Sequence, residues 1–443
     1  MITWTCFLMA VAVGAVAGAD CNTKANITGP PNFHPVDTTA PYFLARVPNG
    51  ELYMAGTPGN DFTYLLHVYG TNGYDFGYAA GRLLKKEMTA LLSSAWTYFE
   101  DKIIRVINGT ANKYNIPPSI VKMIAEIGLE AVLDLQNDES ERFVDPEIYA
   151  EMRGIADAAG LDYKMIRRIH LIGEITRGAC SFYGAWGSAT AGGKTLQLRA
   201  LDWDTGANLQ RFPLVTIYHP QTPSMGVPFA NVGWAGWIGT LTGMSSQQIG
   251  ISEIGISYPN YPPYFGDESF VGIPFIFLER QILQHGKSVY DAMEMITNAN
   301  RTCRLMLGVA DAKAETARLV QYSHSEVHFY NDTDLQPDAW WHPRMPNVVY
   351  AGMDWFCPFY QHSLYQQLSL YHGMLTPEIS ILNVTSAVMT GDLHLAVYDL
   401  TDGLLYVANH APNGMSTPFL NAYERQFIRL NVSYLFSKPY GED

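Results

Sequence analysis

The sequence has few charged residues, and basic residues are the scarcer kind. Charged residues make up 16% of the 443 positions, whereas apolar residues make up 48%. This composition is typical of a chain that buries a core, and it excludes a mainly disordered protein. Asp and Glu number 42 against 28 Lys and Arg, which gives a net charge of −14. We therefore expect no nucleic-acid partner and no attachment to an anionic membrane surface.

Long apolar runs are also missing, except at the N-terminus. MITWTCFLMAVAVGAVAGAD is apolar from Phe7 to Val16 and ends in Ala-Gly-Ala. This pattern is typical of a secretory signal peptide with an A-x-A cleavage site, whereas a membrane-spanning helix needs a longer run. We predict a signal peptide over residues 1–19 and no integral membrane anchor.

Sequons support passage through the secretory pathway. Six N-x-S/T triplets follow the apolar run, which predicts a glycosylated surface. The acidic net charge suits a lysosome, but it is equally compatible with the extracellular fluid. The six triplets begin at Asn26, Asn108, Asn300, Asn331, Asn383 and Asn431.

Cysteines are few for a secreted chain. Cys6 lies in the predicted signal peptide, which leaves Cys21, Cys180, Cys303 and Cys357. Four cysteines can form two disulfides. The alternative leaves Cys180 free as a reactive thiol, with a second cysteine also unpaired.

Familiar catalytic motifs are missing as well. The sequence has no H-E-x-x-H pair for zinc and no G-x-S-x-G elbow for a serine nucleophile. AGGKT at 191–195 resembles part of a phosphate-binding loop, but Ser188 stands where that loop needs glycine. We interpret these residues as a hairpin turn and expect no metal and no cofactor.

The two halves of the chain differ in their hydrophobic pattern. From about Tyr74 to Arg177 apolar residues recur at helical spacing. After Cys180 short runs rich in β-branched and aromatic residues predict strands, interrupted by a helical pair over 274–300. No repeat or linker marks a second domain, so we predict one α+β unit of stacked layers.

The segment RGACSFYGAWGSATAGGKTLQLRALDWDTG contains the strongest chemical signal. Its two strand-like runs flank a Gly-Gly turn, and an antiparallel hairpin brings Cys180 close to Arg199 and Asp202. A nearby guanidinium favours a thiolate, and a carboxylate can orient an amine. A buried cysteine beside a structural ion pair would have the same spacing, so the residues alone leave both interpretations open.

The order of motifs resembles the N-terminal-nucleophile hydrolases. GYDFGYAAGRL and EIYAEMRGIADAAGL are followed by Gly-Ala-Cys-Ser and a hairpin that ends in Arg-x-x-Asp-Trp. The arrangement is most similar to the acid ceramidase and isopenicillin-N acyltransferase group, with phospholipase B-like proteins more distant. The resemblance is firm over about half the chain. It implies a four-layer αββα sandwich built from two antiparallel sheets.

The resemblance also implies self-cleavage of the precursor between Ala179 and Cys180. Residues 20–179 would become a mainly helical α-chain, and residues 180–443 a β-chain that stays associated with it. The new α-amino group of Cys180 would act as the base for its own thiol. By family precedent an early cysteine tethers the two chains, which makes Cys21–Cys357 or Cys21–Cys303 the candidate disulfide.

Further site residues are carried over by position. Arg199 would stabilise charge beside the nucleophile, and Asp202 would hold the α-amino group. Glu253 in ISEIGIS matches a family glutamate, although another register places Ser257 there. The family's oxyanion asparagine has no clear match. The candidates are in NVVYAGMDWFC, at Asn347 or Asp354.

These expectations define one principal function and three alternatives. The principal expectation is a thiol amidohydrolase that cleaves an N-acyl amide lipid, such as a ceramide or an N-acylethanolamine, through a Cys180 thioester. The alternatives are a phospholipase B-like ester hydrolase, an acyltransferase, and an inactive lipid-binding homologue.

Overall fold

The computed structural model describes residues 28–109, 116, 118–176, 178–255, 266–335, 340–354 and 358–442. The predicted signal peptide, Asn26, Cys21, Ser257 and Cys357 lie outside these ranges. The candidate disulfides therefore stay predictions.

Two sheets form the centre of the molecule, and their strands are antiparallel except for one parallel pair, β3 with β6. The larger sheet has ten strands, which are, in spatial order, β1 (Tyr42–Val47), β2 (Gly50–Gly56), β3 (Phe62–Gly70), β6 (Pro213–Pro220), β7 (Phe229–Trp234), β8 (Thr242–Ser245), β9 (Ile249–Ile254), β10 (Leu305–Asp311), β11 (Thr316–Tyr322) and β12 (Val327–Tyr330). The smaller sheet has six, which are β13 (Val348–Ala351), β4 (Ala179–Gly187), β5 (Gly193–Asp202), β14 (His394–Asp399), β15 (Leu404–Asn409) and β16 (Ile428–Asn431).

The two sheets pack face to face. Strands β4 and β5 of the smaller sheet contact β9 and β10 of the larger one. Phe182 on β4 packs so closely on β10 that a Cβ added at Gly308 would lie 2.0 Å from its ring. Gln197 on β5 donates a hydrogen bond of 2.6 Å to Ser252 on β9. The interior between the sheets is therefore mostly apolar, with a few polar links between them.

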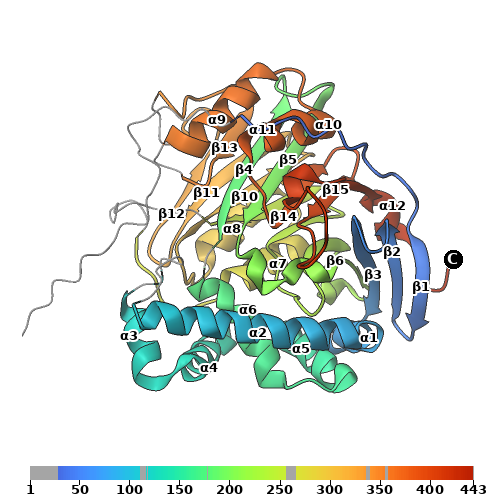
Figure 1. Ribbon diagram of the computed structural model, residues 1–443, viewed down its shortest axis with the longest axis vertical. Helices are drawn as coiled ribbons and strands as arrows, with labels where there is room; N and C mark the ends of the chain where they lie inside the picture. Colours follow the sequence, from blue (N-terminus) through green and yellow to red (C-terminus); the bar gives the residue numbers. More distant parts are fainter. Residues whose placement is uncertain are drawn as a thin grey trace, which may run out of the picture.

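Helices cover both outer faces of this pair of sheets (Figure 1). The smaller sheet is covered by α9 (Pro358–Leu370), α10 (Pro377–Ile379) and α11 (Ser386–Val388), with a π-helical turn over Ser380–Thr385. The larger sheet is covered by α7 (Phe275–His285) and α8 (Val289–Asn298), and α1 packs on β2 and β3. The predicted αββα sandwich is confirmed.

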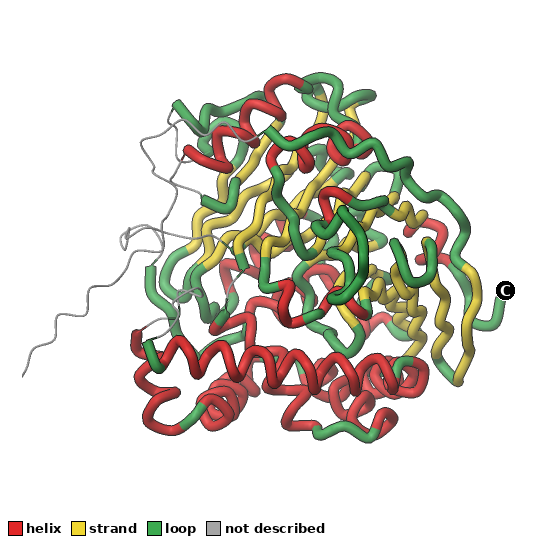
Figure 2. The backbone as a smooth tube through the Cα atoms, viewed as in Figure 1, coloured by secondary structure: helices red, strands yellow, loops and turns green. Residues whose placement is uncertain are grey.

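The N-terminal helices form a further group beneath the larger sheet, which Figure 2 shows as a band of red tubes at the bottom. They are α1 (Gly73–Leu83), α2 (Lys85–Ile107), α3 (Pro118–Ile127), α4 (Leu129–Ser140), α5 (Pro146–Ala159) and α6 (Tyr163–Ile175). A last short helix, α12 (Val432–Ser437), packs on β6 and β15, and the C-terminus lies beside β1 (Figure 1).

Local sequence signals explain where these helices begin and how closely they pack. Asp145 caps α5 by accepting from the N–H of Glu147, Pro146 occupies the first turn, and Gly160 ends the helix at φ 70°. Helix α1 lies so close to α5 that a Cβ at Gly77 would lie 1.9 Å from the carbonyl oxygen of Glu151.

The structure adds three strands that the hydrophobic pattern did not predict. Residues 20–179 are mainly helical, but β1, β2 and β3 precede the helices and join the larger sheet. Pro48 and Asn49, the latter at φ 64°, form the turn between β1 and β2, in which Val47 pairs with Gly50, and this Pro-Asn-Gly sequence is the turn signal that could have predicted the hairpin.

The hairpin that the sequence predicted at AGGKT is present. Strands β4 and β5 pair across the AGGKT turn, where Gly192 and Gly193 have φ near 74° and 73°. Lys194 pairs with Asp399 at 2.9 Å and with Asp402 at 2.6 Å. The AGGKT segment is thus a turn, and its lysine is engaged by the neighbouring β14–β15 hairpin.

Candidate active site

Cys180 lies at the start of β4 and points into the space between the sheets. Because side chains alternate along a strand, it shares the inner face with Phe182 and Gly184, both of which meet the larger sheet. On β5 the inner face includes Gln197 and Arg199, and Arg199 is paired in register with Phe182. The hairpin therefore brings the Arg199 guanidinium to 3.6 Å from the Cys180 sulfur.

Glu253 completes a buried three-residue cluster with Cys180 and Arg199. Its carboxylate accepts a hydrogen bond of 2.8 Å from Arg199 Nη2, and its main-chain carbonyl accepts one of 3.2 Å from Arg199 Nε. The Cys180 thiol lies 3.6 Å from the same carboxylate. Cys180 and Arg199 are fully buried, and Glu253 is 4% exposed. The hairpin thus brings Arg199 to the thiol, and Glu253, which comes from the other sheet, is a potential base beside it.

The electrostatics of this cluster differ from the simple expectation of an arginine-stabilised thiolate. Burial raises the pKa of the Cys180 thiol well above its usual value, and the charge of Glu253 raises it further. Arg199 lowers this pKa, but its charge is already matched by Glu253. Burial and Glu253 therefore favour the neutral thiol in the intact chain, while Arg199 favours the thiolate, as the hairpin predicted.

Asp202 lies on the opposite face of β5 from Arg199, because the two residues are three positions apart. Its carboxylate accepts hydrogen bonds from the Thr390 hydroxyl at 2.8 Å and from the N–H groups of Gly391 and Asp392 at 2.9 and 3.1 Å. Burial raises the pKa of Asp202 to about 6, while these donors oppose the shift. In register Asp202 faces Ala179, so it lies beside the proposed cleavage bond but not beside the thiol.

Small residues enclose the peptide that precedes Cys180. The N–H of Cys180 donates a 2.8 Å hydrogen bond to the carbonyl of Gly255. A Cβ at Gly255 would lie 2.0 Å from the carbonyl oxygen of Gly178, so no larger residue fits there. Gly178 and Ala179 are partly exposed, whereas Cys180 is not. The Ala179–Cys180 bond is thus held at the border between surface and interior.

The two candidates for an oxyanion residue lie at different ends of β4. Asn347 precedes β13, bonds to Trp186 through its carbonyl and to Asp332 through its N–H, and has φ 59°. It lies beside the turn end of β4, about 20 Å from Cys180 at roughly 3.3 Å per strand residue. The structure therefore separates Asn347 from the site.

Asp354 follows β13 at the end where Ala351 pairs with Phe182. Its carboxylate accepts from the N–H groups of Tyr360 and Gln361 at 2.9 and 3.0 Å, which fixes the start of α9. Asp354 thus lies at the Cys180 end of the smaller sheet, although its oxygens are engaged by backbone donors.

A wholly apolar cavity that the sequence did not locate borders the segment before Cys180. It lies between α2 and the strand ends, and its lining includes Phe99, Trp203, Trp234 and Trp237. A Cβ at Gly178 would lie 3.3 Å from Cβ of Trp203, so the cavity wall contacts this segment directly. Two of these tryptophans, Trp234 and Trp237, belong to the GWAGWIG segment.

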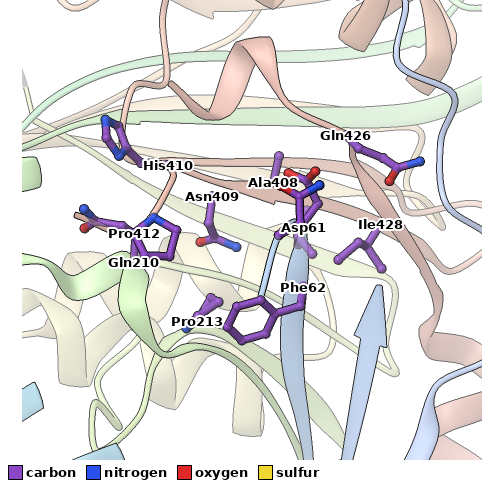
Figure 3. A pocket seen from close by; sticks show the side chains of 12 residues that line it. Asp61, Phe62, Gln210, Pro213, Ala408, Asn409, His410, Pro412, Gln426 and Ile428 are labelled. Atoms are coloured by element: carbon purple, nitrogen blue, oxygen red, sulfur yellow. The ribbon is translucent and has the colours of Figure 1, made fainter. Parts of the chain in front are cut away.

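A second, polar hollow opens at the same end of the smaller sheet (Figure 3). Cys180, Leu201, His394 and Asn409 form one row of register partners across β4, β5, β14 and β15. Asn409 lies in the hollow with Asp61, Gln210 and His410 as neighbours in the lining. At about 4.8 Å per strand, Asn409 is roughly 14 Å from Cys180.

The described ranges contain neither a metal-binding cluster nor a membrane-crossing helix. Within these ranges, no cluster of three or more His, Cys, Asp or Glu side chains is arranged to hold a metal ion. No helix in the same ranges is long and apolar enough to cross a membrane.

The fold and site together define a layered α+β protein with a cysteine-centred cluster between its sheets. The chain is 34% identical over 418 residues to protein dcd1B of Dictyostelium discoideum, covering 91% of this chain and 81% of that protein. It is 33% identical over 437 residues to protein dcd1A of the same organism, covering 94% and 95%. The chain therefore belongs to the family of dcd1A and dcd1B. No family model matches it.

Two solved structures show a distant likeness to the chain. A Caenorhabditis elegans N-acylethanolamine-hydrolyzing acid amidase ortholog is 16% identical with a TM-score of 0.37, covering 50% of this chain and 93% of that one. Penicillin V acylase from Agrobacterium tumefaciens is 13% identical with a TM-score of 0.34, covering 53% and 84%.

Proposed function

We propose that this protein is a self-processing thiol amidohydrolase that cleaves an N-acyl amide lipid through a thioester on Cys180. The observation that carries the proposal is the buried Cys180–Arg199–Glu253 cluster directly after the Gly178-Ala179 peptide. Cys180 is a free thiol in the described structure. The alternative is a purely structural cysteine beside an ion pair. Such a cysteine does not require the close contact between Gly255 and Gly178 that holds the preceding peptide near the surface.

Self-cleavage requires a base other than the α-amino group, which does not yet exist in the precursor. Glu253 is within hydrogen-bond distance of the thiol and can take its proton. The sulfur then attacks the carbonyl carbon of Ala179, the C–N bond to Cys180 breaks, and the nitrogen receives a proton. Water hydrolyses the thioester, which leaves a carboxylate on Ala179 and a free thiol and amine on Cys180.

The mature site repeats this chemistry on the substrate. An unperturbed α-amino group titrates at about 7.7–8.0, so it can accept the thiol proton near neutral pH. Arg199 balances the negative charge of the thiolate. The thiolate attacks the amide carbonyl, the amine product leaves with a proton, and water releases the acid.

The apolar cavity supports a lipid acyl group. In self-cleavage the Ala179 carbonyl is the acyl carbon, so the acyl part of a later substrate would follow the path of Gly178. That path leads to Trp203 and the apolar cavity.

We also propose that the protein passes through the secretory pathway to the lysosome or the extracellular fluid. Of the five sequon asparagines in the described ranges, Asn108, Asn300 and Asn431 are exposed, and Asn331 and Asn383 are partly exposed. None is buried, which is what glycosylation requires. Mass loss on treatment of the secreted protein with a glycosidase tests this part.

Hydrolysis of defined lipids tests the activity. The purified protein is incubated with a ceramide, an N-acylethanolamine and a diacyl phospholipid at acid and neutral pH, with and without an added amine. We expect fatty-acid release from an amide, loss of release in Cys180→Ala, and retention in the matched control Cys303→Ala, which alters another buried cysteine. Release from the phospholipid alone would favour an esterase, and acyl transfer to the amine would favour a transferase. Lipid retention without turnover would overturn the enzymatic proposal.

A further inference from the structure

Glu279 is a buried carboxyl that the proposed reaction does not use. It lies on α7, which packs against β9, the strand that carries Glu253. Its side chain is fully buried, and neither carboxyl oxygen has a hydrogen-bond partner among the described residues. An ionised carboxylate in such surroundings would be very unfavourable.

The groups around Glu279 belong to the Cys180 cluster. The negative charge of Glu253 raises the pKa of Glu279, Arg199 lowers it, and burial raises it most, so that it stands well above the usual value. Tyr398 on β14 and Tyr322 on β11 also interact electrostatically with Glu279. Arg199 has one further buried nitrogen, Nη1, with no partner in the described part of the chain.

Counting charges shows why the protonation of Glu279 matters. One cation, Arg199, faces two carboxyl groups and one thiol. If Glu279 is neutral, Arg199 balances the single anion on Glu253. Transfer of the proton from the Cys180 sulfur to Glu253 then moves this anion to sulfur and keeps the cluster neutral. If Glu279 is ionised, the same transfer creates a thiolate next to an unbalanced negative charge.

We propose that Glu279 is a positioning residue for Cys180: it carries a proton in the folded protein and thereby reserves Arg199 for the thiolate. The inference rests on Cys180 being the nucleophile proposed above. It adds that loss of the Glu279 proton opposes thiolate formation, so that the site works below the pH at which Glu279 ionises.

Infrared difference spectroscopy tests the protonation without any activity. We expect wild type at pH 7 to show the carbonyl band of a protonated carboxyl, and Glu279→Gln to lose it. Glu174→Gln is the matched control, because Glu174 is a buried glutamate on α6 whose carboxylate accepts from the N–H of Phe275. The control should keep the band. A spectrum of Glu279→Gln equal to that of wild type would overturn the proposal.

The pH dependence of Cys180 alkylation by iodoacetamide tests the link to the thiol. At low pH we expect equal rates in wild type and Glu279→Gln, because glutamine imitates the protonated carboxyl. Above the ionisation of Glu279 we expect the variant to react faster, about tenfold for each unit by which the thiol pKa falls. A merely structural role would shift stability without separating the two profiles, so coincident profiles overturn the proposal. Separated profiles in a protein that never hydrolyses an amide would support this inference while refuting the proposed function.

Discussion

Replacing one member of the Arg199–Glu253 ion pair should lower the free energy of unfolding considerably. Replacing both members together should lower it much less than the two single changes add up to. Arg199→Met leaves the Glu253 carboxylate, 4% exposed, without the cation that lies 2.8 Å away. Removal of one member of a buried pair typically costs about 3–5 kcal/mol, whereas replacing both members is often nearly neutral. Glu253→Gln keeps a hydrogen-bond acceptor for the guanidinium, so its loss of stability should lie at the lower end of this range.

The measurement is a double-mutant cycle by denaturant unfolding. All four proteins carry Cys180→Ala, so that none of them can cut itself and all are compared as intact chains. We expect the double variant Arg199→Met/Glu253→Gln to be more stable than the sum of the single changes predicts, by at least about 2 kcal/mol. Additivity within about 0.5 kcal/mol would refute the cluster, because residues in contact must couple.

The pH dependence of Arg199→Met gives an internal check. Without the cation, burial raises the folded-state pKa of Glu253 above its unfolded value, so the folded state binds the proton more tightly. The free energy of unfolding of this variant must then fall as pH rises above the unfolded value, relative to its parent. A penalty that is independent of pH between 4 and 8 would contradict a buried, unpaired carboxyl at this position.

Three further predictions concern other parts of the structure. Gly77→Ala should lower stability by about 1–3 kcal/mol, because its Cβ would lie 1.9 Å from a backbone oxygen of α5, and an unchanged melting curve would contradict this packing. Asp202→Asn should flatten the pH dependence of stability between about 4 and 6, since the raised pKa of Asp202 makes its contribution decline as pH rises through about 6; parallel curves for the two proteins would contradict the burial of this carboxyl. Trp203→Leu should raise KM for long-chain amides more than for short-chain ones, and equal effects on both would argue against an acyl path along this side chain.

Local signals predicted much of the fold. The Gly-Gly turn predicted the β4–β5 hairpin, because a turn depends on a few neighbouring residues. The same holds for the ends of α5, where Asp145, Pro146 and Gly160 follow the rules for helix caps. The three N-terminal strands were missed although Pro48-Asn49-Gly50 is a turn signal. Strand β3 pairs with β6, which lies far along the chain, and no local pattern specifies such a partner.

The candidate site was predictable only in part, because some of its residues come from elements far apart in the sequence. The hairpin register brings Cys180 and Arg199 together, but strand parity sends Asp202 to the other face. Glu253 enters from a different sheet, so its contact with Arg199 follows from how the sheets stack. Glu279 comes from a helix behind the larger sheet, and its sequence context resembles any amphipathic helix. Burial without a partner is visible only once the layers are assembled.

The N-terminus of the mature protein tests the central claim most directly. The chain and its Cys180→Ala variant are expressed, incubated at acid pH, and analysed by reducing gel and terminal sequencing. The account predicts two fragments from wild type, the larger beginning with Cys180, and a single uncut chain from the variant. An uncut wild type, or a variant that is cut at the same bond, would contradict it.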